Sequence, residues 1–231
     1  MFEALKQAVY DANMELYHRG LVLYTWGNVS QCDREKGVFA IKPSGVEYEK
    51  LTPDDIVVLS LEDGSKLEGD FNPSSDTPTH FGLYRAFEGI GGITHTHSTC
   101  AVAWAQAGKE IPCLGTTHAD YIRGSVPVTR YLTPDETERA YEAETATVII
   151  EAFKDKNPVH TPAVLVRGHG PFTWGKDGAQ SVYHAVVLEE VAKMAMYTAS
   201  IGEICALPAH IQDKHFLRKH GPKAYYGQKG K

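Results

Sequence analysis

The sequence predicts a single α/β domain built on a central, mixed β-sheet. Short β-like runs alternate with segments of helical periodicity along the whole chain, which is the pattern of an α/β protein. No repeat and no low-complexity linker interrupts residues 1–231, so one domain is expected. Two pairs of short strands in the first third indicate hairpins, which argues against a purely parallel sheet.

The first third of the chain combines one helix with these hairpins. Apolar residues recur at helical spacing over residues 2–18, and Gly20 is suited to end the helix. The β-like runs NVSQC and VFAIK flank the turn DREKG, and IVVLSL and SKLEG flank EDG. These pairs predict strands joined by tight turns.

Helices and strands alternate in the remaining chain. Pro78 suits the first turn of a helix, where its missing N–H group costs nothing, and Thr133 with Glu136 forms a capping-box pattern. Helices are predicted over 76–88, 98–108, about 133–153, 179–200 and 211–220. Strands are predicted at GGITHTH and AVLVRGH, and short ones near IPCLGT and VPVTRY.

Composition excludes several classes of protein. The chain has no run of 18 apolar residues, and its start lacks the basic segment and apolar block of a signal peptide, so we expect a cytoplasmic protein without a membrane span. The four cysteines form no C-x-x-C pair, which argues against a disulfide framework or zinc knuckle. A net charge of −6 without a long basic tract argues against nucleic-acid binding.

Histidines near two strand ends are candidate metal ligands. His95 and His97 lie two residues apart, so in a strand they project from the same face about 6.5 Å apart. Alone, this pair is equally compatible with two solvated imidazoles. His169, between Gly168 and Gly170, follows another apolar strand. Three histidines can bind one ion and leave room on it for substrate or water.

Three loops carry small and hydroxyl residues that suit an anion. The segment PSSDTPTH begins a predicted helix, whose free N–H groups can hold a phosphate, and Asp76 there can turn toward a metal. For each loop alone, helix capping or a plain turn explains the same residues. The candidates are Gly27 and Asn28 in TWGNVS, Lys42, Ser44 and Gly45 in KPSG, and Ser74 and Ser75.

Acid/base candidates lie later in the chain. Asp120 in TTHADY can act as a general acid or base, although a helix cap or surface carboxylate explains it better when the segment is taken alone. The ending DKHFLRKHGPKAYYGQ combines basic residues with Tyr225 and Tyr226, which indicates a docked tail rather than a frayed end. A catalytic tyrosine needs a positive field, because its reference pKa is about 10.

Seven segments, in order, resemble the class II aldolase family of the aldolase II and adducin head-domain superfamily, and within it the pentulose-5-phosphate 4-epimerases. They are TWGNVS, KPSG, PSSDTPTH, GGITHTH, GTTHADY, LVRGHGPFTWG and DKHFLRKHGPKAYYGQ. The resemblance implies helices on both sides of the mixed sheet and a homotetramer, with the tail of about 208–231 docking at a neighbouring subunit. It departs from the family pattern only at Arg167-Gly168 and in the closing Lys-Gly-Lys.

The same resemblance implies a role for each candidate residue. Zn²⁺, or Mn²⁺ or Co²⁺ in its place, is bound by Asp76, His95, His97 and His169. Asp120 and Tyr226 match the acid/base pair, and the tyrosine acts at the site of a neighbouring subunit. The residues that match the substrate and phosphate site are Gly27, Asn28, Lys42, Ser44, Gly45, Ser74, Ser75, Thr116, His215 and Arg218.

The implied reaction interconverts L-ribulose 5-phosphate and D-xylulose 5-phosphate. No carbonyl group lies next to C4 to acidify its hydrogen, so the epimerases cleave the C3–C4 bond, rotate the aldehyde and rejoin it on the other face. The cleavage needs a Lewis acid, and the C4 oxygen needs acid/base groups on both faces.

Three other functions are weighed against this one. An aldolase of the L-fuculose-1-phosphate type carries a catalytic glutamate at the position of Asp76, and the shorter aspartate favours metal binding. A non-catalytic module like the adducin head is expected to lose the metal ligands, which are present here. A zinc hydrolase does not need the phosphate loops.

Overall fold

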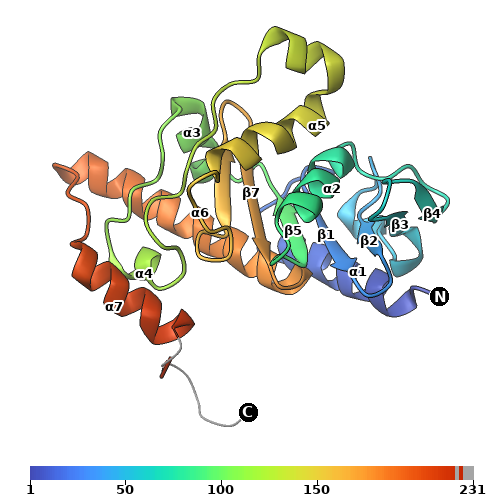
Figure 1. Cartoon of the computed structure of the whole chain (residues 1–231), viewed down its shortest axis with the longest axis horizontal. Helices are drawn as coiled ribbons and strands as arrows, with labels where there is room; N and C mark the ends of the chain where they lie inside the picture. Colours follow the sequence, from blue (N-terminus) through green and yellow to red (C-terminus); the bar gives the residue numbers. More distant parts are fainter. Residues whose placement is uncertain (222–223, 226–231) are drawn as a thin grey trace.

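A computed structural model describes residues 1–221, 224 and 225, and a seven-stranded sheet lies at the centre of this part of the chain (Figure 1). The order across the sheet is β4-β3-β2-β1-β5-β7-β6. The strands are β1 (Asn28–Asp33), β2 (Val38–Ile41), β3 (Val57–Ser60), β4 (Lys66–Glu68), β5 (Gly92–His95), β6 (Ala163–Val166) and β7 (Gly170–Gly175).

The ladders between the named strands are all antiparallel, whereas the sequence predicted a mixture of parallel and antiparallel pairs. Among the described residues, parallel pairing occurs only at the isolated bridge between Val128 and Leu165. The predicted strands near IPCLGT and VPVTRY are likewise reduced to isolated bridges. Strand β7 was not predicted; it has a glycine at each end and a proline, which are residues that usually interrupt a strand.

The helices agree with the predicted segments to within about two residues at each end. Among the described residues, the single-turn helix α4 and two 3-10 turns had not been predicted. The helices are α1 (Glu3–His18), α2 (Thr77–Ala86), α3 (Thr99–Ala107), α4 (Thr116–Ala119), α5 (Pro134–Ala152), α6 (Gly178–Ile201) and α7 (Ala209–His220), with 3-10 turns at Tyr48–Lys50 and Pro53–Asp55.

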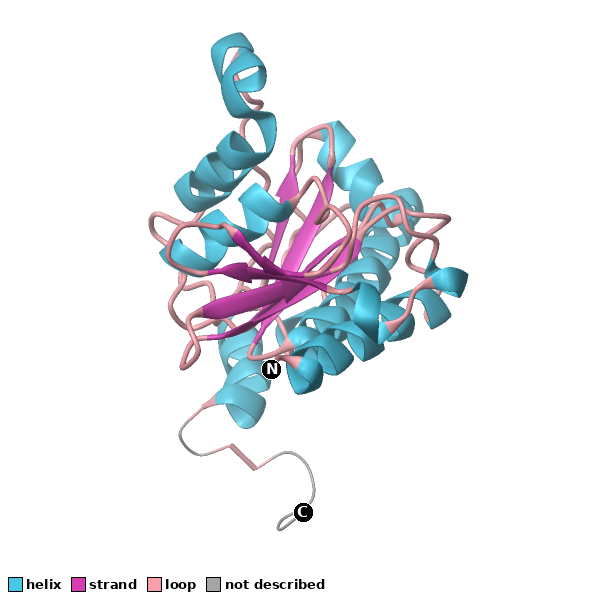
Figure 2. Cartoon of the chain, turned by 90° about the vertical axis from the view of Figure 1, so that its right-hand side faces the viewer, coloured by secondary structure: helices cyan, strands magenta, loops and turns pink. Residues whose placement is uncertain are grey.

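Helices cover both faces of the sheet, as the fold class predicts (Figure 2). On one face, α2 and α5 pack Leu83, Tyr84 and Ile149 against strand residues that include Trp174. On the other face, α1 and α6 pack over β1, and α3 packs against α6. Each large apolar side chain buried in this way contributes about 1.5–3 kcal/mol. The result is a three-layer α/β domain.

The register of the central strands brings three segments to one edge of the sheet. Asn28, the first residue of β1, pairs with His95, the last residue of β5. His95 also pairs with Phe172 near the start of β7. Directly opposed residues of antiparallel strands project from the same face, so these three side chains form a row. Ser30 pairs with Ile41, so the loop after β2 lies at the same edge.

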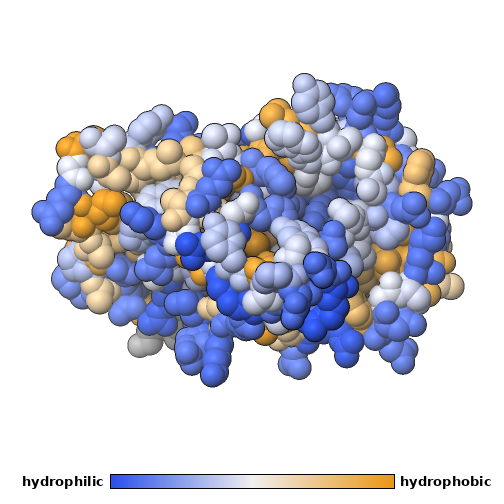
Figure 3. Space-filling view, turned by 90° about the horizontal axis from the view of Figure 1, so that it is seen from above, coloured by the Kyte–Doolittle hydropathy of each residue, from blue (hydrophilic) through white to orange (hydrophobic). Residues whose placement is uncertain are grey.

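The surface is mostly hydrophilic when the molecule is viewed from above (Figure 3). Hydrophobic groups gather at its left-hand end, where Figure 1 places the C-terminal part of α6. Exposed apolar residues of that helix include Met194, Tyr197 and Ile201. Across the described residues, no helix combines the length and apolar character needed to span a membrane.

Candidate metal centre

Three histidines from two chain segments converge at this edge of the sheet. His95 ends β5, His97 follows two residues later, and His169 immediately precedes β7. The ring centroids are 4.9 Å apart for His95 and His97, 4.8 Å for His95 and His169, and 5.1 Å for His97 and His169. One ring nitrogen from each histidine lies within 4.8 Å of the others, which is a grouping that can hold a metal ion.

Neighbouring groups orient two of these rings. The Nδ1 of His95 lies 3.0 Å from the carbonyl oxygen of Pro171, so Nδ1–H donates there and Nε2 is left to face the other histidines. Phe172 stacks on the same ring with centroids 4.2 Å apart. The Nδ1 of His169 lies 3.4 Å from the hydroxyl of Tyr141. A hydrogen bond to the second ring nitrogen is the usual way to orient a metal-binding imidazole.

The chemistry of these rings fits a divalent cation. The Nε2 atoms of His95 and His97 are 3.1 Å apart. Two nitrogens bound to one tetrahedral ion at about 2.0–2.1 Å lie about 3.3–3.4 Å apart, so little movement is needed. Burial lowers the pKa of His169 to about 4 and lowers the pKa of His97, so at neutral pH both rings are neutral, the form that binds a metal.

Asp76 lies beside the histidines, at the N-terminal end of α2. Its Oδ2 accepts a hydrogen bond of 2.7 Å from Nδ2 of Asn28, which also donates to Ser74 Oγ at 3.0 Å. Burial acts to raise the pKa of this carboxyl group, but the nearby histidines and Asn28 outweigh it and hold the pKa below its usual range. The carboxylate is not part of the group of ligand atoms within 4.8 Å.

A cavity of about 420 Å³ contains both the histidines and the predicted phosphate loops. Two backbone hydrogen bonds tie these loops together, from Ser44 N to Asn72 O at 3.0 Å and from Ser74 N to Lys42 O at 3.1 Å. The predicted residues that line the cavity are Gly27, Asn28, Lys42, Ser44, Gly45, Ser74, Ser75, Asp76, His95, His97 and His169.

Lys42 is a buried cation at the cavity wall. Its side chain is 1 % exposed, and burial lowers its pKa to about 8. The ammonium group donates to the carbonyl oxygens of Pro43 and Val46 and lies 4.7 Å from the centre of the Tyr48 ring. Lys42 therefore shapes the loop 43–46 while it adds positive charge to the cavity.

Gly27 fills a position that no larger residue fits without movement. Its φ of +74° lies in the left-handed region, and a Cβ atom there would lie 2.7 Å from the backbone oxygen of His95 and 2.8 Å from Val22. Strand β5 can therefore approach this turn closely only because residue 27 is glycine. The contact links the TWGNVS segment directly to a histidine of the metal centre.

The structure adds Tyr141 and Glu142, which sequence patterns did not indicate, to the cavity wall. Helix α5 is broken at Ala140, where φ is −168° and ψ is 72°. Thr79 in α2 donates to the carbonyl oxygen of Glu142 at 2.6 Å, which holds the segment after the break over the cavity. Neither glycine nor proline marks the break, and the capping box at Thr133 predicts an uninterrupted helix.

Asp120 lies in a different cluster, between α4 and α7. Arg218 donates two hydrogen bonds to its carboxylate, at 3.0 and 2.7 Å, and His215 lies 2.9 Å from the same group. Burial acts to raise the pKa of Asp120, but the hydrogen bonds from Arg218 and His215 lower it overall. The backbone N–H of Asp120 donates to Thr116 O at 2.9 Å, so Thr116 belongs to this cluster as well.

The Asp120 cluster does not line the cavity that contains the histidines. Helix α7 packs beside α4 of its own chain, with Phe216 buried (Figure 1). Within the predicted docking tail, helix α7 (Ala209–His220) thus packs against its own chain, and docking at a neighbouring subunit stays a prediction. Tyr226, the other predicted acid/base residue, lies outside the described residues.

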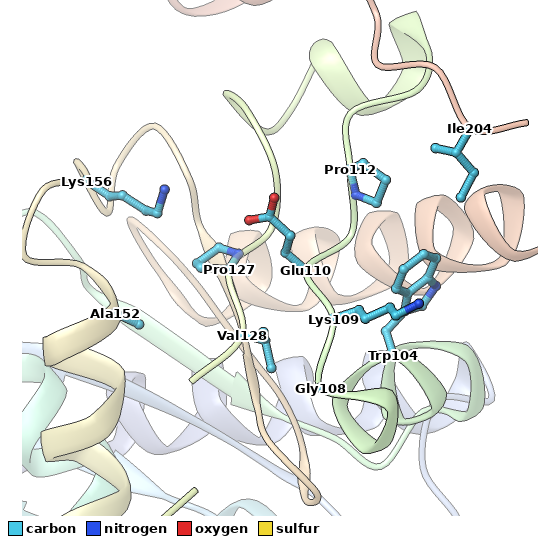
Figure 4. Close-up of a pocket in the computed structure, with 10 residues that line it drawn as sticks. All are labelled: Trp104, Gly108, Lys109, Glu110, Pro112, Pro127, Val128, Ala152, Lys156 and Ile204. Atoms are coloured by element: carbon cyan, nitrogen blue, oxygen red, sulfur yellow. The ribbon is translucent and has the colours of Figure 1, made fainter. Parts of the chain in front are cut away.

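A larger hollow of about 640 Å³ lies elsewhere on the domain, and Figure 4 shows the residues that line it. Glu110 lies between Lys156 and Lys109, and Trp104 and Ile204 are at one end. None of the histidines or hydroxyl loops reaches it. The smaller cavity is therefore the better candidate for a functional site.

Sequence comparison identifies the family to which this fold and its three-histidine cavity belong. Residues 7–196 match the model of the class II aldolase and adducin N-terminal domain, so the chain belongs to that family. A solved L-fuculose 1-phosphate aldolase is 28% identical, with a TM-score of 0.76 over 92% of this chain and 94% of its own. The L-fuculose-1-phosphate aldolase from Thermus thermophilus is also 28% identical, with a TM-score of 0.69 over 87% and 98%.

More distant structures share the fold. YgbL from Klebsiella pneumoniae, described as a putative aldolase/epimerase/decarboxylase, is 24% identical with a TM-score of 0.72, covering 93% of this chain and 99% of its own. The chain is thus a class II aldolase-like protein with a histidine cluster that can hold a divalent metal.

Proposed function

We propose that this protein is a metal-dependent 4-epimerase that interconverts L-ribulose 5-phosphate and D-xylulose 5-phosphate. One observation carries the proposal: the three histidines share a cavity with a short carboxylate, Asp76, and with hydroxyl and glycine loops that suit a phosphate. A zinc hydrolase would need the metal without these loops.

The cavity residues have distinct tasks in this proposal. The hydroxyls of Ser44, Ser74 and Ser75 and the backbone N–H groups of Gly45 and Ser75 hold the phosphate, helped by the charge of Lys42. The same grip retains the aldehyde fragment while it rotates. A divalent ion at the histidines, Zn²⁺ or Mn²⁺ or Co²⁺ in its place, would polarise the C2 and C3 oxygens as a Lewis acid.

The acid/base pair, Asp120 and Tyr226, exchanges protons with the C4 oxygen on opposite faces of the substrate. Asp120 does not line the cavity of its own chain, so in this proposal its cluster completes the cavity of an adjacent subunit in a homotetramer. The exposed apolar residues of α6 (Met194, Tyr197 and Ile201) offer a contact surface for that assembly.

A class II aldolase of the L-fuculose-1-phosphate type is the second candidate. Two solved enzymes of that name are 28% identical to this chain over most of its length. Asp76 argues for the epimerase, because the aldolases use a glutamate at this position, and a glutamate is long enough to reach a substrate carbon. Here the carboxylate is instead held by Asn28 next to the histidines.

NMR of a single reaction mixture tests the proposal. Metal-loaded protein is added to L-ribulose 5-phosphate, and D-xylulose 5-phosphate is expected to appear without free intermediates. Accumulated glycolaldehyde phosphate, or cleavage of L-fuculose 1-phosphate at a higher rate, would identify an aldolase. Failure to convert either sugar phosphate would favour a binding module. The His97→Asn variant is the control for contaminating activity.

A further inference from the structure

Polar contacts from Asp76, His80 and Tyr84 join helix α2 and its N-cap to strand β1 near the metal centre. Asp76 and His80 are four residues apart, so their side chains lie on the same face of the helix. Asn28 and Ser30 are two residues apart, so they project from the same face of the strand. Asp76 bonds to Asn28 at 2.7 Å, and one helical turn further His80 Nδ1 lies 2.7 Å from Ser30 Oγ.

The contact between His80 and Ser30 fits either tautomer of His80, and the hydrogen-bond needs of the two hydroxyl groups favour one of them. The Oγ of Ser30 lies 2.7 Å from both His80 Nδ1 and the hydroxyl of Tyr84. Ser30 has one hydrogen to donate. If Tyr84 donates to Ser30 and Ser30 donates to Nδ1, each hydroxyl hydrogen has an acceptor and the ring proton is on Nε2. Burial lowers the pKa of His80 to about 3, so the ring is neutral.

In this tautomer, Nε2 of His80 is a hydrogen-bond donor without an acceptor in the described part of the chain, and Oδ1 of Asn28 is an acceptor without a donor there. Among the described residues, Asn28 Oδ1 and His80 Nε2 are the buried side-chain polar atoms without a hydrogen-bond partner. Asn28 is 2 % exposed and His80 is fully buried. Leaving such an atom unpaired costs about 1–3 kcal/mol. The acceptor belongs to the Asn28–Asp76 contact, and the donor belongs to the neighbouring contact between Ser30 and His80.

We propose that His80 is a positioning residue of the metal centre: its Nε2–H group fixes the amide of Asn28 through one water molecule. The fixed amide then directs its NH₂ group to Asp76 and Ser74, and so holds the carboxylate beside the histidines. Tyr84 and Ser30 act one step further away, because they set the tautomer of His80. This inference rests on the proposed metal site and does not depend on which sugar phosphate reacts.

A matched pair of variants separates positioning from packing. His80→Gln keeps an N–H donor near the position of Nε2, whereas His80→Asn keeps a group near Nδ1 and loses that donor. Each full-length variant is loaded with Co²⁺, whose visible absorption reports ligand geometry. We expect His80→Asn to alter the spectrum and to lower cobalt affinity 10–100-fold. His80→Gln should stay within about threefold of the unmodified protein, well below that range.

A second measurement needs no substitution. In metal-free protein labelled with ¹⁵N-histidine, the ring shifts of His80 should show the proton on Nε2. A proton on Nδ1, or equal effects of the two variants, would overturn the proposal. His184→Asn is the control, because His184 is also buried and bonded through Nδ1, to Trp174 O at 2.6 Å, but lies in α6 on the other face of the sheet. Neither readout requires epimerase turnover, so failure of the proposed reaction would be seen separately.

Discussion

Replacing Gly27 with alanine tests whether the turn before β1 must lie close to His95 at the end of β5. An alanine at φ +74° costs about 1–2 kcal/mol of unfolding free energy from the left-handed backbone alone. Its Cβ would also lie 2.7 Å from His95 O and 2.8 Å from Val22, and such overpacking costs about 1–3 kcal/mol more. The total expected loss is about 2–5 kcal/mol.

Gly37→Ala separates the two contributions. Gly37 has a similar φ of +66°, but a Cβ there would meet nothing within 4 Å. Urea unfolding of both variants at one protein concentration should therefore show a smaller loss for Gly37→Ala, about 1–2 kcal/mol. Metal affinity should fall only in Gly27→Ala, because only that change displaces the backbone of His95. Equal losses, within about 0.5 kcal/mol, would refute the reasoning.

Three further predictions address the site itself. His97→Asn should remove most bound metal and turnover, as measured by metal analysis and the epimerase assay, and turnover that persists in metal-stripped protein would contradict the mechanism. Tyr226→Phe should slow epimerisation while metal content stays unchanged, and a normal rate would remove Tyr226 from its role. If the site is shared, tetramers assembled from equal amounts of inactive His97→Asn and Asp120→Asn chains should regain roughly a quarter of full activity. Half of the sites would have an intact histidine set, and half of those would have a neighbour with an intact Asp120. No recovery of activity would mean that both residues act in the site of one subunit.

The dependence of stability on pH should reveal the contact between Asp120 and α7. The pKa of Asp120 is lower in the folded protein than its usual value, so the ionised carboxylate stabilises the fold. That contribution is complete above the unfolded pKa of about 3.9 and is lost as pH falls through the lower folded pKa. The melting temperature should therefore fall less on acidification in Asp120→Asn than in the unmodified protein, and parallel curves would contradict this.

The periodicity of apolar residues predicted the helices well, because helix formation depends on residues close together in the sequence. The helices around Leu16, Leu83 and Ile149 have the expected spacing, and their predicted ends agree closely with the structure. The capping box predicted at Thr133 is present, whereas Asp76 at the start of α2 makes no side-chain cap. Strand direction was harder to predict. The long connection from β5 to β6 carries three helices, so β6 can enter the sheet in either direction, and alternation of strands and helices suggested parallel pairing where the pairs are antiparallel.

The metal centre was predictable in part because two of its histidines lie two residues apart. His80 and Tyr141 were not predicted, for different reasons. His80 has the spacing of an ordinary buried helix residue, and only the fold shows that its ring reaches Ser30. Tyr141 reaches His169 because α5 breaks at Ala140, and packing on α2 rather than a local sequence signal accounts for that break.

The three histidines differ in how freely they can move. His95 is held by strands on both sides, by Pro171 and by the Phe172 ring. His169 instead follows Gly168, which has a φ of +74°, and precedes Gly170 in a short turn. His95 therefore has more contacts that hold its ring in place than His169 has. We expect such a centre to accept ions of different radius with similar activity, so that the metal available in the cell, more than the protein, decides which one is bound.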